Sequence, residues 1–348
     1  MIPSQLLAPN TTYQLALNVS ALDVDGNQID RNQIIAFTTG AARPLHSWIT
    51  FVTSQPGGAP SGLWIVNELG YPRQLFTTDS VHSFSWSPGG STLLAQGDHE
   101  VWWELTPGVG ATRLGFKAAW ASALAAGMGY AFIDDSGTLH RESADGVDEV
   151  IATDVTQATV TPDGLRVAFV LGAAGPDEIW GYDVGLRARY ELVTDTGPIS
   201  DVTWSPAANR IAYLRSDVGS TTLRIRNLAG SGATTTIATG DIGAPAWFPD
   251  SVHMVFTVAV ANPTITHKAF VVNAVAPSAT LNLAQGLPAD PAVDLSSPIP
   301  SPDGHQIAYL SGDQVWLMNA DGTRPTPLTQ ADPEFFPYSC RTPAWTTA

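Results

Sequence analysis

Short apolar runs, each closed by a turn, alternate with polar residues along most of the chain. The stretch SPDGHQIAYLSGDQVWLMNADGTRPTPL (residues 301–328) contains such runs, closed by Pro-Asp-Gly, Gly-Asp and Ala-Asp-Gly-Thr. Residues 161–193 and 204–238 carry the same turns at the same offsets. Apolar and β-branched runs bounded by Gly, Pro and Asp are typical of short β-strands joined by tight turns. The pattern therefore predicts an all-β fold built from a repeated unit.

The repeated unit contains four strands, and its first strand ends in an aromatic residue followed by a turn. The signature of this first strand occurs in VHSFSWSPGG (81–90), AWASALAAGMG (119–129), TQATVTPDG (156–164), ISDVTWSPAA (199–208), GAPAWFPDS (243–251), SPIPSPDGH (297–305) and RTPAWTTA (341–348). These segments recur about 37 to 54 residues apart, the range of a four-stranded propeller blade. We therefore predict a seven-bladed β-propeller of four-stranded antiparallel blades.

The last of these first strands has no second strand behind it, because the chain stops at Ala348. Residues 46–54, 62–68 and 72–78 supply a second, third and fourth strand without a first strand in front. Pairing residues 342–348 with residues 46–54 would complete a blade and cover edges that an open ring leaves unpaired. We expect the propeller, residues 43–348, to be closed by pairing of its N- and C-terminal strands.

The turns and the tryptophans have structural explanations. Pro presets the backbone angle, Asp accepts a bond from a downstream amide, and Gly takes the positive φ that closes the turn. Asp163, Asp250 and Asp303 are therefore predicted to form turns. Large rings at one position per repeat fill the space between twisted sheets, so packing between blades is predicted for Trp64, Trp86, Trp102, Trp180, Trp204, Trp247, Trp316 and Trp345.

The repeats resemble the WD-like blades of TolB-type β-propellers, whose usual phrase is an aromatic residue, Ser-Pro-Asp-Gly, an Ile-Ala-[Phe/Tyr] strand, Ile-[Tyr/Trp] and a Leu-Thr ending. The likeness covers residues 46–348 and is close in the repeats that start near Phe84, Thr159, Val202 and Pro300. It is loose in residues 119–154, where ALAAGMG replaces the SPDG turn. The resemblance implies the fold and leaves function open, because such blades serve binding platforms and enzymes alike.

Residues 1–42 lack the blade signature. Pro-x-Thr-x-Tyr, an alternating strand, the DVDGN turn and a closing Phe-Thr-Thr-Gly resemble the C-terminal part of a bacterial immunoglobulin-like domain. In such a domain Tyr13 would make the tyrosine corner. DVDGNQID is also similar to a calcium loop, but Gly26 falls one position too early for the EF-hand spacing. We expect a short β appendage that is part of an immunoglobulin-like domain.

Composition and charge narrow the function. The formal net charge is −16 and lysine occurs only at 117 and 268, which excludes nucleic acid as the main partner. No apolar run is long enough for a membrane span, and the N-terminus lacks the pattern of a secretory signal. The single Cys340 cannot form an intramolecular disulfide, and no Cys/His spacing indicates zinc.

No catalytic motif is present: GxSxG, HExxH and the Walker A sequence are all missing. We therefore prefer a non-catalytic binding or scaffold propeller of an extracellular or periplasmic, multi-domain bacterial protein, with no cofactor or metal. The alternative is a metal-dependent polysaccharide lyase or a related carbohydrate-active propeller. Some similar seven-bladed propellers are such lyases and use histidine ligands on the channel face, where His82, His99 and His267 are expected to lie near loops.

The predicted binding face depends on carboxylates that recur just after the fourth strand: Asp79, Asp154, Asp195, Asp241 and Asp332. These segments lead from the outer edge of one blade to the inner strand of the next, so all should lie on one face. Beside them, the loop 331–341 presents Phe335, Phe336 and Tyr338, which could hold a sugar ring or an extended peptide. We predict a protein, peptide or carbohydrate ligand there. The alternative is that each Asp only binds turn amides and the aromatic rings cover the closing seam.

Overall fold

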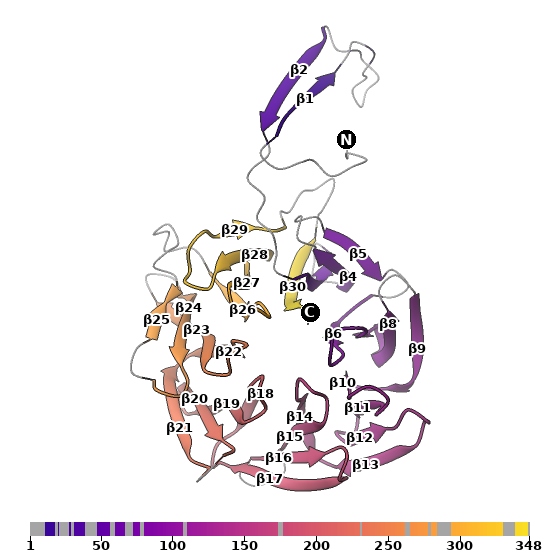
Figure 1. Cartoon of the computed structure of the whole chain (residues 1–348), viewed down its shortest axis with the longest axis vertical. Coiled ribbons are helices and arrows are strands. Elements are labelled where there is room, and N and C mark those ends of the chain that lie inside the picture. Colours follow the sequence, from indigo (N-terminus) through magenta and orange to yellow (C-terminus); the bar gives the residue numbers. More distant parts are fainter. Residues whose placement is uncertain are drawn as a thin grey trace. The chain divides into compact units, whose positions relative to one another are not determined.

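Seven four-stranded antiparallel sheets form a ring in the computed structural model, and a separate two-stranded sheet lies in the N-terminal part of the chain (Figure 1). The chain divides into two units, residues 1–45 and residues 46–348. The structure describes residues 11–17, 20, 28, 31–38, 47–55, 60–66, 72–76, 80–106, 110–172, 177–229, 232–261, 265–277, 280–283, 294–329 and 338–346. The seven-bladed all-β propeller predicted from the repeats is confirmed.

Six sheets take four strands that are consecutive in the chain. The first three of them contain β6 (Ser83–Trp86), β7 (Leu93–Gln96), β8 (Val101–Thr106) and β9 (Gly110–Lys117); β10 (Trp120–Ala123), β11 (Tyr130–Ile133), β12 (Leu139–Glu142) and β13 (Asp148–Ala152); and β14 (Val155–Val160), β15 (Arg166–Leu171), β16 (Glu178–Asp183) and β17 (Ala188–Thr194). The next three contain β18 (Ile199–Trp204), β19 (Arg210–Asp217), β20 (Ser220–Asn227) and β21 (Thr234–Gly240); β22 (Ile242–Trp247), β23 (His253–Ala261), β24 (Ile265–Asn273) and β25 (Thr280–Asn282); and β26 (Ser296–Pro300), β27 (Gln306–Ser311), β28 (Gln314–Asn319) and β29 (Thr326–Pro327).

The remaining sheet joins the two ends of the propeller segment. Its order is β30 (Ser339–Trp345), β3 (Ile49–Ser54), β4 (Pro60–Val66) and β5 (Pro72–Phe76). Ile49 lies opposite Trp345, and the amide of Thr346 donates to the carbonyl of Trp48 at 2.8 Å. The predicted closure by terminal strands is therefore confirmed.

Buried apolar side chains lie between neighbouring sheets. Leu139 of β12 shares a cluster with Val167 of β15, and Leu223 of β20 shares another with Met254 of β23. The strands alternate side chains toward the two faces of each sheet, so each blade contacts the blade before it and the blade after it. The hydrophobic core of the propeller is thus divided among the seams between blades.

Tryptophans fill these seams, as predicted. Trp102, Trp204, Trp247 and Trp345 are buried. The indole Nε1 of Trp345 donates to the carbonyl of Ile299 in the preceding blade at 2.8 Å. The rings therefore combine apolar burial with a polar contact across a seam.

The Pro-Asp-Gly turns have the predicted geometry. The Asp163 carboxylate accepts the amide of Leu165 at 3.0 Å, and Gly164 has φ +71°. Asp303 accepts a downstream amide in the same way, and so does Asp250, where Ser251 at φ +59° takes the place of glycine.

The turns that join first and second strands also touch each other across seams. Gly164 accepts the amide of Ala125 at 3.0 Å, from the ALAAGMG loop of the neighbouring blade. A Cβ atom at Gly164 would lie 2.3 Å from the Ala125 nitrogen, so this close approach requires glycine.

The N-terminal unit contains the antiparallel pair β1 (Thr12–Leu17) and β2 (Gln33–Thr38), with Tyr13 opposite Phe37. The short β appendage is therefore present. The DVDGN turn, residues 23–27, lies outside the described residues, and the immunoglobulin-like assignment stays a prediction. A short helical turn, η1, covers Asp98–Glu100, and no helix in the described part of the chain is long and apolar enough to span a lipid bilayer.

Removal of the Trp345 ring tests the closure. We expect Trp345→Ala to lower the free energy of unfolding by about 3–5 kcal/mol, because the ring is buried in the seam between β30 and β26. Urea unfolding followed by fluorescence measures the change. Val218→Ala, at a fully exposed turn position, is the control and should change stability by less than about 0.5 kcal/mol. A loss below about 1 kcal/mol for Trp345→Ala would contradict the closure as a source of stability.

Candidate functional site

The topology of the blades sorts the loops onto two faces of the ring. Strands run antiparallel in chain order, so the loop between the second and third strands lies at the same end as the segment that follows the fourth strand. Contacts agree: the carbonyl of Asp154 accepts the amide of Gly172 at 3.1 Å, and the carbonyl of Asp241 accepts the amide of Ala259 at 2.9 Å. We call this end the acidic face and the opposite end the turn face.

Carboxylates gather on the acidic face. In its described loops and flanking strand residues they are Asp98, Glu100, Asp134, Asp135, Asp154, Asp177, Glu178, Asp195, Asp217, Asp241, Asp294 and Asp313. Within those same described segments, Lys117 is the one lysine or arginine. The face therefore carries a strong negative potential that attracts cations.

Three of the predicted binding carboxylates are described. Asp154 and Asp241 are exposed on the acidic face, and Asp195 is buried there. Asp79 and Asp332 lie outside the described residues.

Asp195 links two blades through an ion-pair network. Arg224 Nη1 donates a hydrogen bond to the Asp195 carboxylate at 2.6 Å, and Arg215 Nε forms an ion pair with it at 3.0 Å. The Asp195 side chain is only 7% exposed. The Tyr213 hydroxyl donates to the same carboxylate at 3.0 Å. All three partners belong to the following blade. Because a buried carboxylate is costly without partners, these contacts explain why Asp195 is tolerated inside the seam.

Two other tyrosines bridge neighbouring blades in the same manner. The Tyr130 hydroxyl donates to Glu104 and the Tyr182 hydroxyl donates to Glu149, each at 3.0 Å. Burial and the adjacent carboxylate raise the pKa of Tyr130, Tyr182 and Tyr213 to about 12 each. The carboxylate makes the neutral hydroxyl the favoured form of the tyrosine.

Of the predicted aromatic cluster, Tyr338 is described, whereas Phe335 and Phe336 lie outside the described residues. The Tyr338 ring is 5.8 Å from the Trp64 ring, and the Tyr338 carbonyl accepts Gln314 Nε2 at 3.0 Å. Tyr338 therefore lies at the closing seam, next to the start of β30.

A cavity of about 400 Å³ opens on the acidic face between the β6–β9, β10–β13 and β14–β17 sheets. Its lining includes Glu100, Trp120, Asp134, Asp135 and Gln157. The indole of Trp120 is partly exposed beside these carboxylates. An aromatic ring next to several carboxylates suits a cationic group.

The sequence interpretation missed this cavity. Trp120 is the first residue of its strand, whereas Trp86, Trp204, Trp247 and Trp345 end theirs. This departure from the repeat could have identified Trp120 as a candidate site residue. A ring at the start of the first strand lies on the acidic face, whereas a ring at the end of that strand lies near the turns. The clustering of Glu100 and Asp135 has no signal in the sequence.

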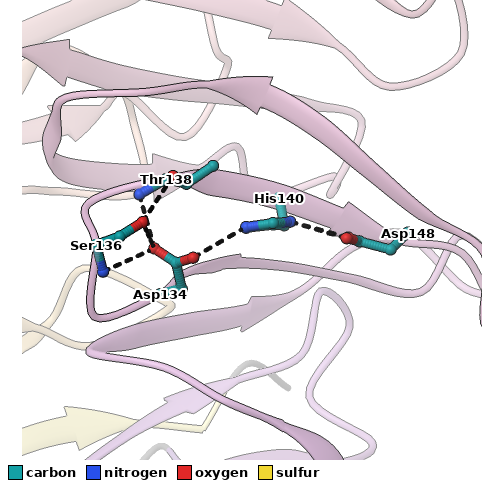
Figure 2. Close-up of polar contacts among 5 residues, drawn as sticks. All are labelled: Asp134, Ser136, Thr138, His140 and Asp148. Atoms are coloured by element: carbon teal, nitrogen blue, oxygen red, sulfur yellow. Dashed lines mark hydrogen bonds and ion pairs between the residues drawn. The ribbon is translucent and has the colours of Figure 1, made fainter.

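Asp134 is held in place within the cavity by a polar chain (Figure 2). Its carboxylate accepts the Ser136 and Thr138 amides at 3.0 and 2.8 Å and contacts His140 Nε2 at 3.3 Å. The other ring nitrogen of His140 lies 3.0 Å from Asp148. Burial alone would raise the pKa of Asp134, but the hydrogen bonds from Ser136, Thr138 and His140 outweigh it and hold the pKa below its usual value. Asp134 therefore stays ionised at neutral pH.

The histidines of the lyase alternative do not share a partner. His82 lies 2.8 Å from Asp98 and His267 lies 2.9 Å from Asp294, while His99 is exposed. In the described part of the chain, no group of three or more His, Cys, Asp or Glu side chains is arranged to hold a metal ion.

No protein-family model and no curated protein matches the sequence. Solved structures are similar in fold. TolB from Acinetobacter baumannii is 17% identical with a TM-score of 0.55, covering 87% of this chain and 67% of that one. A putative TolB from Agrobacterium tumefaciens is 16% identical with a TM-score of 0.53, covering 81% and 88%. An oligogalacturonate lyase in complex with manganese is 12% identical with a TM-score of 0.58, covering 84% and 87%. At these identities the likeness shows the fold, which is a TolB-like seven-bladed propeller.

The tyrosine bridges predict a loss of stability in alkali. In the unfolded chain these tyrosines ionise near pH 10, whereas the three folded ones retain their protons to about pH 12. The unfolded state therefore releases protons first, and the stability from the bridges falls as the pH rises from 10 to 12 and is unchanged below 10. Urea midpoints measured from pH 8 to 12 should show this fall.

Tyr213→Phe provides the comparison, because it removes one titrating hydroxyl and keeps the ring. Its stability should fall less steeply between pH 10 and 12 than that of the unaltered protein. Equal slopes in the two proteins would show that the Tyr213 pKa is not raised.

Proposed function

We propose that this chain is a non-catalytic binding propeller that recognises a cationic partner on its acidic face. The observation that supports this is the recurrence of carboxylates at one end of blade after blade, with Lys117 as the one lysine or arginine in those described segments. Asp195 and Asp217 pair with arginines, and Asp98, Asp134 and Asp294 contact histidines. The other seven carboxylates of this set make no ion pair with a described residue. A surface of one sign steers partners of the opposite sign and raises their rate of association.

The Trp120 cavity would hold one cationic group of the partner. Its volume of about 400 Å³ falls within the range of small-ligand sites. Trp120 offers a ring face, and Glu100, Asp134 and Asp135 offer charge. A lysine or arginine side chain of a protein or peptide combines the apolar stem and the charged end that this lining suits. A carbohydrate carrying an amino group would be the other ligand of matching chemistry.

The aromatic residues Phe335, Phe336 and Tyr338 remain part of this proposal as a second contact region, of which Tyr338 lies at the closing seam. The exposed Asp154 and Asp241 would add charge around the same face. The predicted set of binding residues also includes Asp79, Asp332 and the buried Asp195.

We further propose that the chain works in a bacterial envelope or secreted, multi-domain protein. The TolB-like fold supports this, as do the sequence likeness of residues 1–42 to an immunoglobulin-like domain and the β1–β2 hairpin found in them. Fractionation of cells of the source bacterium, with an antibody to the propeller, tests the location.

Charge removal at the cavity tests the binding proposal. With a hexalysine peptide as the probe, Glu100→Gln/Asp135→Asn should weaken affinity at least about tenfold, or roughly 1.4 kcal/mol. The peptide affinity of the unaltered protein should also fall as salt is raised. Isothermal titration calorimetry measures both effects.

The matched control removes two carboxylates from the turn face, at exposed positions of β-turns: Asp145→Asn/Asp321→Asn. It makes the same change in net charge and should leave hexalysine affinity within about twofold. Equal losses in the two double variants would mean that only the overall charge matters, and would contradict a site at the Trp120 cavity.

The metal-dependent lyase predicts a different response. If the protein is a binding propeller, excess Mn²⁺ should raise its melting temperature by less than about 1 °C, because His82 and His267 contact separate aspartates. Differential scanning fluorimetry measures this shift. A rise of several degrees that disappears in His82→Ala/His267→Ala would replace the binding proposal by the lyase.

A further inference from the structure

A second cavity, of about 650 Å³, lies on the turn face between the β14–β17 and β18–β21 sheets. Three arginines from different strands line it: Arg166 at the start of β15, Arg189 in β17 and Arg226 near the end of β20. We call it the arginine cavity. In a chain with 32 acidic and 16 basic residues, three arginines around one cavity are an unusual concentration of positive charge.

These arginines are not used in ion pairs within the part of the chain that the structure describes. The ion pairs there involve Arg141, Arg187, Arg215 and Arg224. Asp183 and Glu191 also line the cavity, but Asp183 accepts the Leu186 amide and Glu191 accepts the Thr194 hydroxyl. No ion pair joins these two carboxylates to the three guanidinium groups, so the lining has three positive side chains against two negative ones and keeps a net positive charge.

Neighbouring residues hold the cavity open and shape it. Tyr190 lies directly opposite Gly181 of β16, where a Cβ atom would approach the tyrosine ring within 2.4 Å. Glycine thus lets the Tyr190 ring lie flat across the third strand. The Arg166 guanidinium stands 5.4 Å from the Trp204 ring centre and forms a hydrogen bond with the Tyr190 side chain. The wall of the cavity is therefore pre-formed by rings that orient one of its arginines.

We propose that the arginine cavity binds a small organic anion through its carboxylate or phosphate oxygens. Guanidinium groups present paired N–H donors that match planar oxyanions. The volume fits a small ligand, and the Tyr190 ring with Leu186 and Leu228 supplies apolar surface for its carbon skeleton. This site lies at the opposite end of the strands from the acidic face, and its ligand has the opposite charge.

Titration with simple anions tests the site. Citrate is the carboxylate probe and inorganic phosphate is the phosphate probe, each measured by calorimetry at low ionic strength and pH 7. We expect at least one of them to bind with a dissociation constant below about 1 mM, corresponding to about 4 kcal/mol. Whichever binds more tightly identifies the preferred oxyanion. If neither binds with a dissociation constant below about 1 mM, the proposal is overturned.

Variants then locate the binding. Arg189 is exposed, so Arg189→Gln should fold normally and weaken binding at least about fivefold, and Arg189→Gln/Arg226→Gln at least about tenfold. The control is Arg113→Gln, an exposed arginine on the outer strand β9 of another blade, which should bind as the unaltered protein does. If Arg113→Gln weakens binding as much as Arg189→Gln, the anion binds through net charge alone and the site is wrong. Because hexalysine binding to the acidic face does not involve these arginines, it should persist in both variants.

Discussion

The pairing of β30 with β3 is the interaction on which the rest of the propeller depends. No blade has a core of its own, because the buried clusters each join two neighbouring sheets, as in the cluster shared by Ile179 and Ile211. Every blade therefore needs a partner on both sides. Without this pairing, the sheets on either side of the opening would each expose an apolar face, and β3 would leave a row of backbone groups unpaired. Bringing residue 345 opposite residue 49 removes both costs in one step.

In the closed ring, the loops of the two faces have different roles. On the turn face, the turns between first and second strands pack on each other: Gly164 meets Ala125, and the Ala207 amide bonds Ser251 Oγ at 2.8 Å. These contacts occupy the inner rim of that face. The loops of the acidic face carry the clustered carboxylates, and loops and strand ends of three neighbouring blades line the Trp120 cavity. The arginine cavity lies among the third-to-fourth-strand turns, outside the packed inner turns.

The architecture could be predicted from the sequence because it rests on local, repeated signals. Asp163 and Gly164 form a turn with their immediate neighbours, and the missing strands at one end match the extra strand at the other. The sites depend instead on contacts between blades. No residue close to Asp195 in the sequence indicates that Arg215 and Arg224 will neutralise it, because both arginines belong to the next repeat. The same holds for the arginine cavity, whose one local signal is the glycine at 181 within a strand.

The two proposed sites should act independently. They lie at opposite ends of the strands, and a six-residue strand such as β16 is about 20 Å long. At physiological salt the Debye length is about 8 Å, so exposed charges at one end barely influence those at the other. Asp195 with its two arginines is also neutralised locally within the seam between the β14–β17 and β18–β21 sheets. The ring can therefore present a negative face to one partner and a positive cavity to another, because the packed seams keep the charges apart.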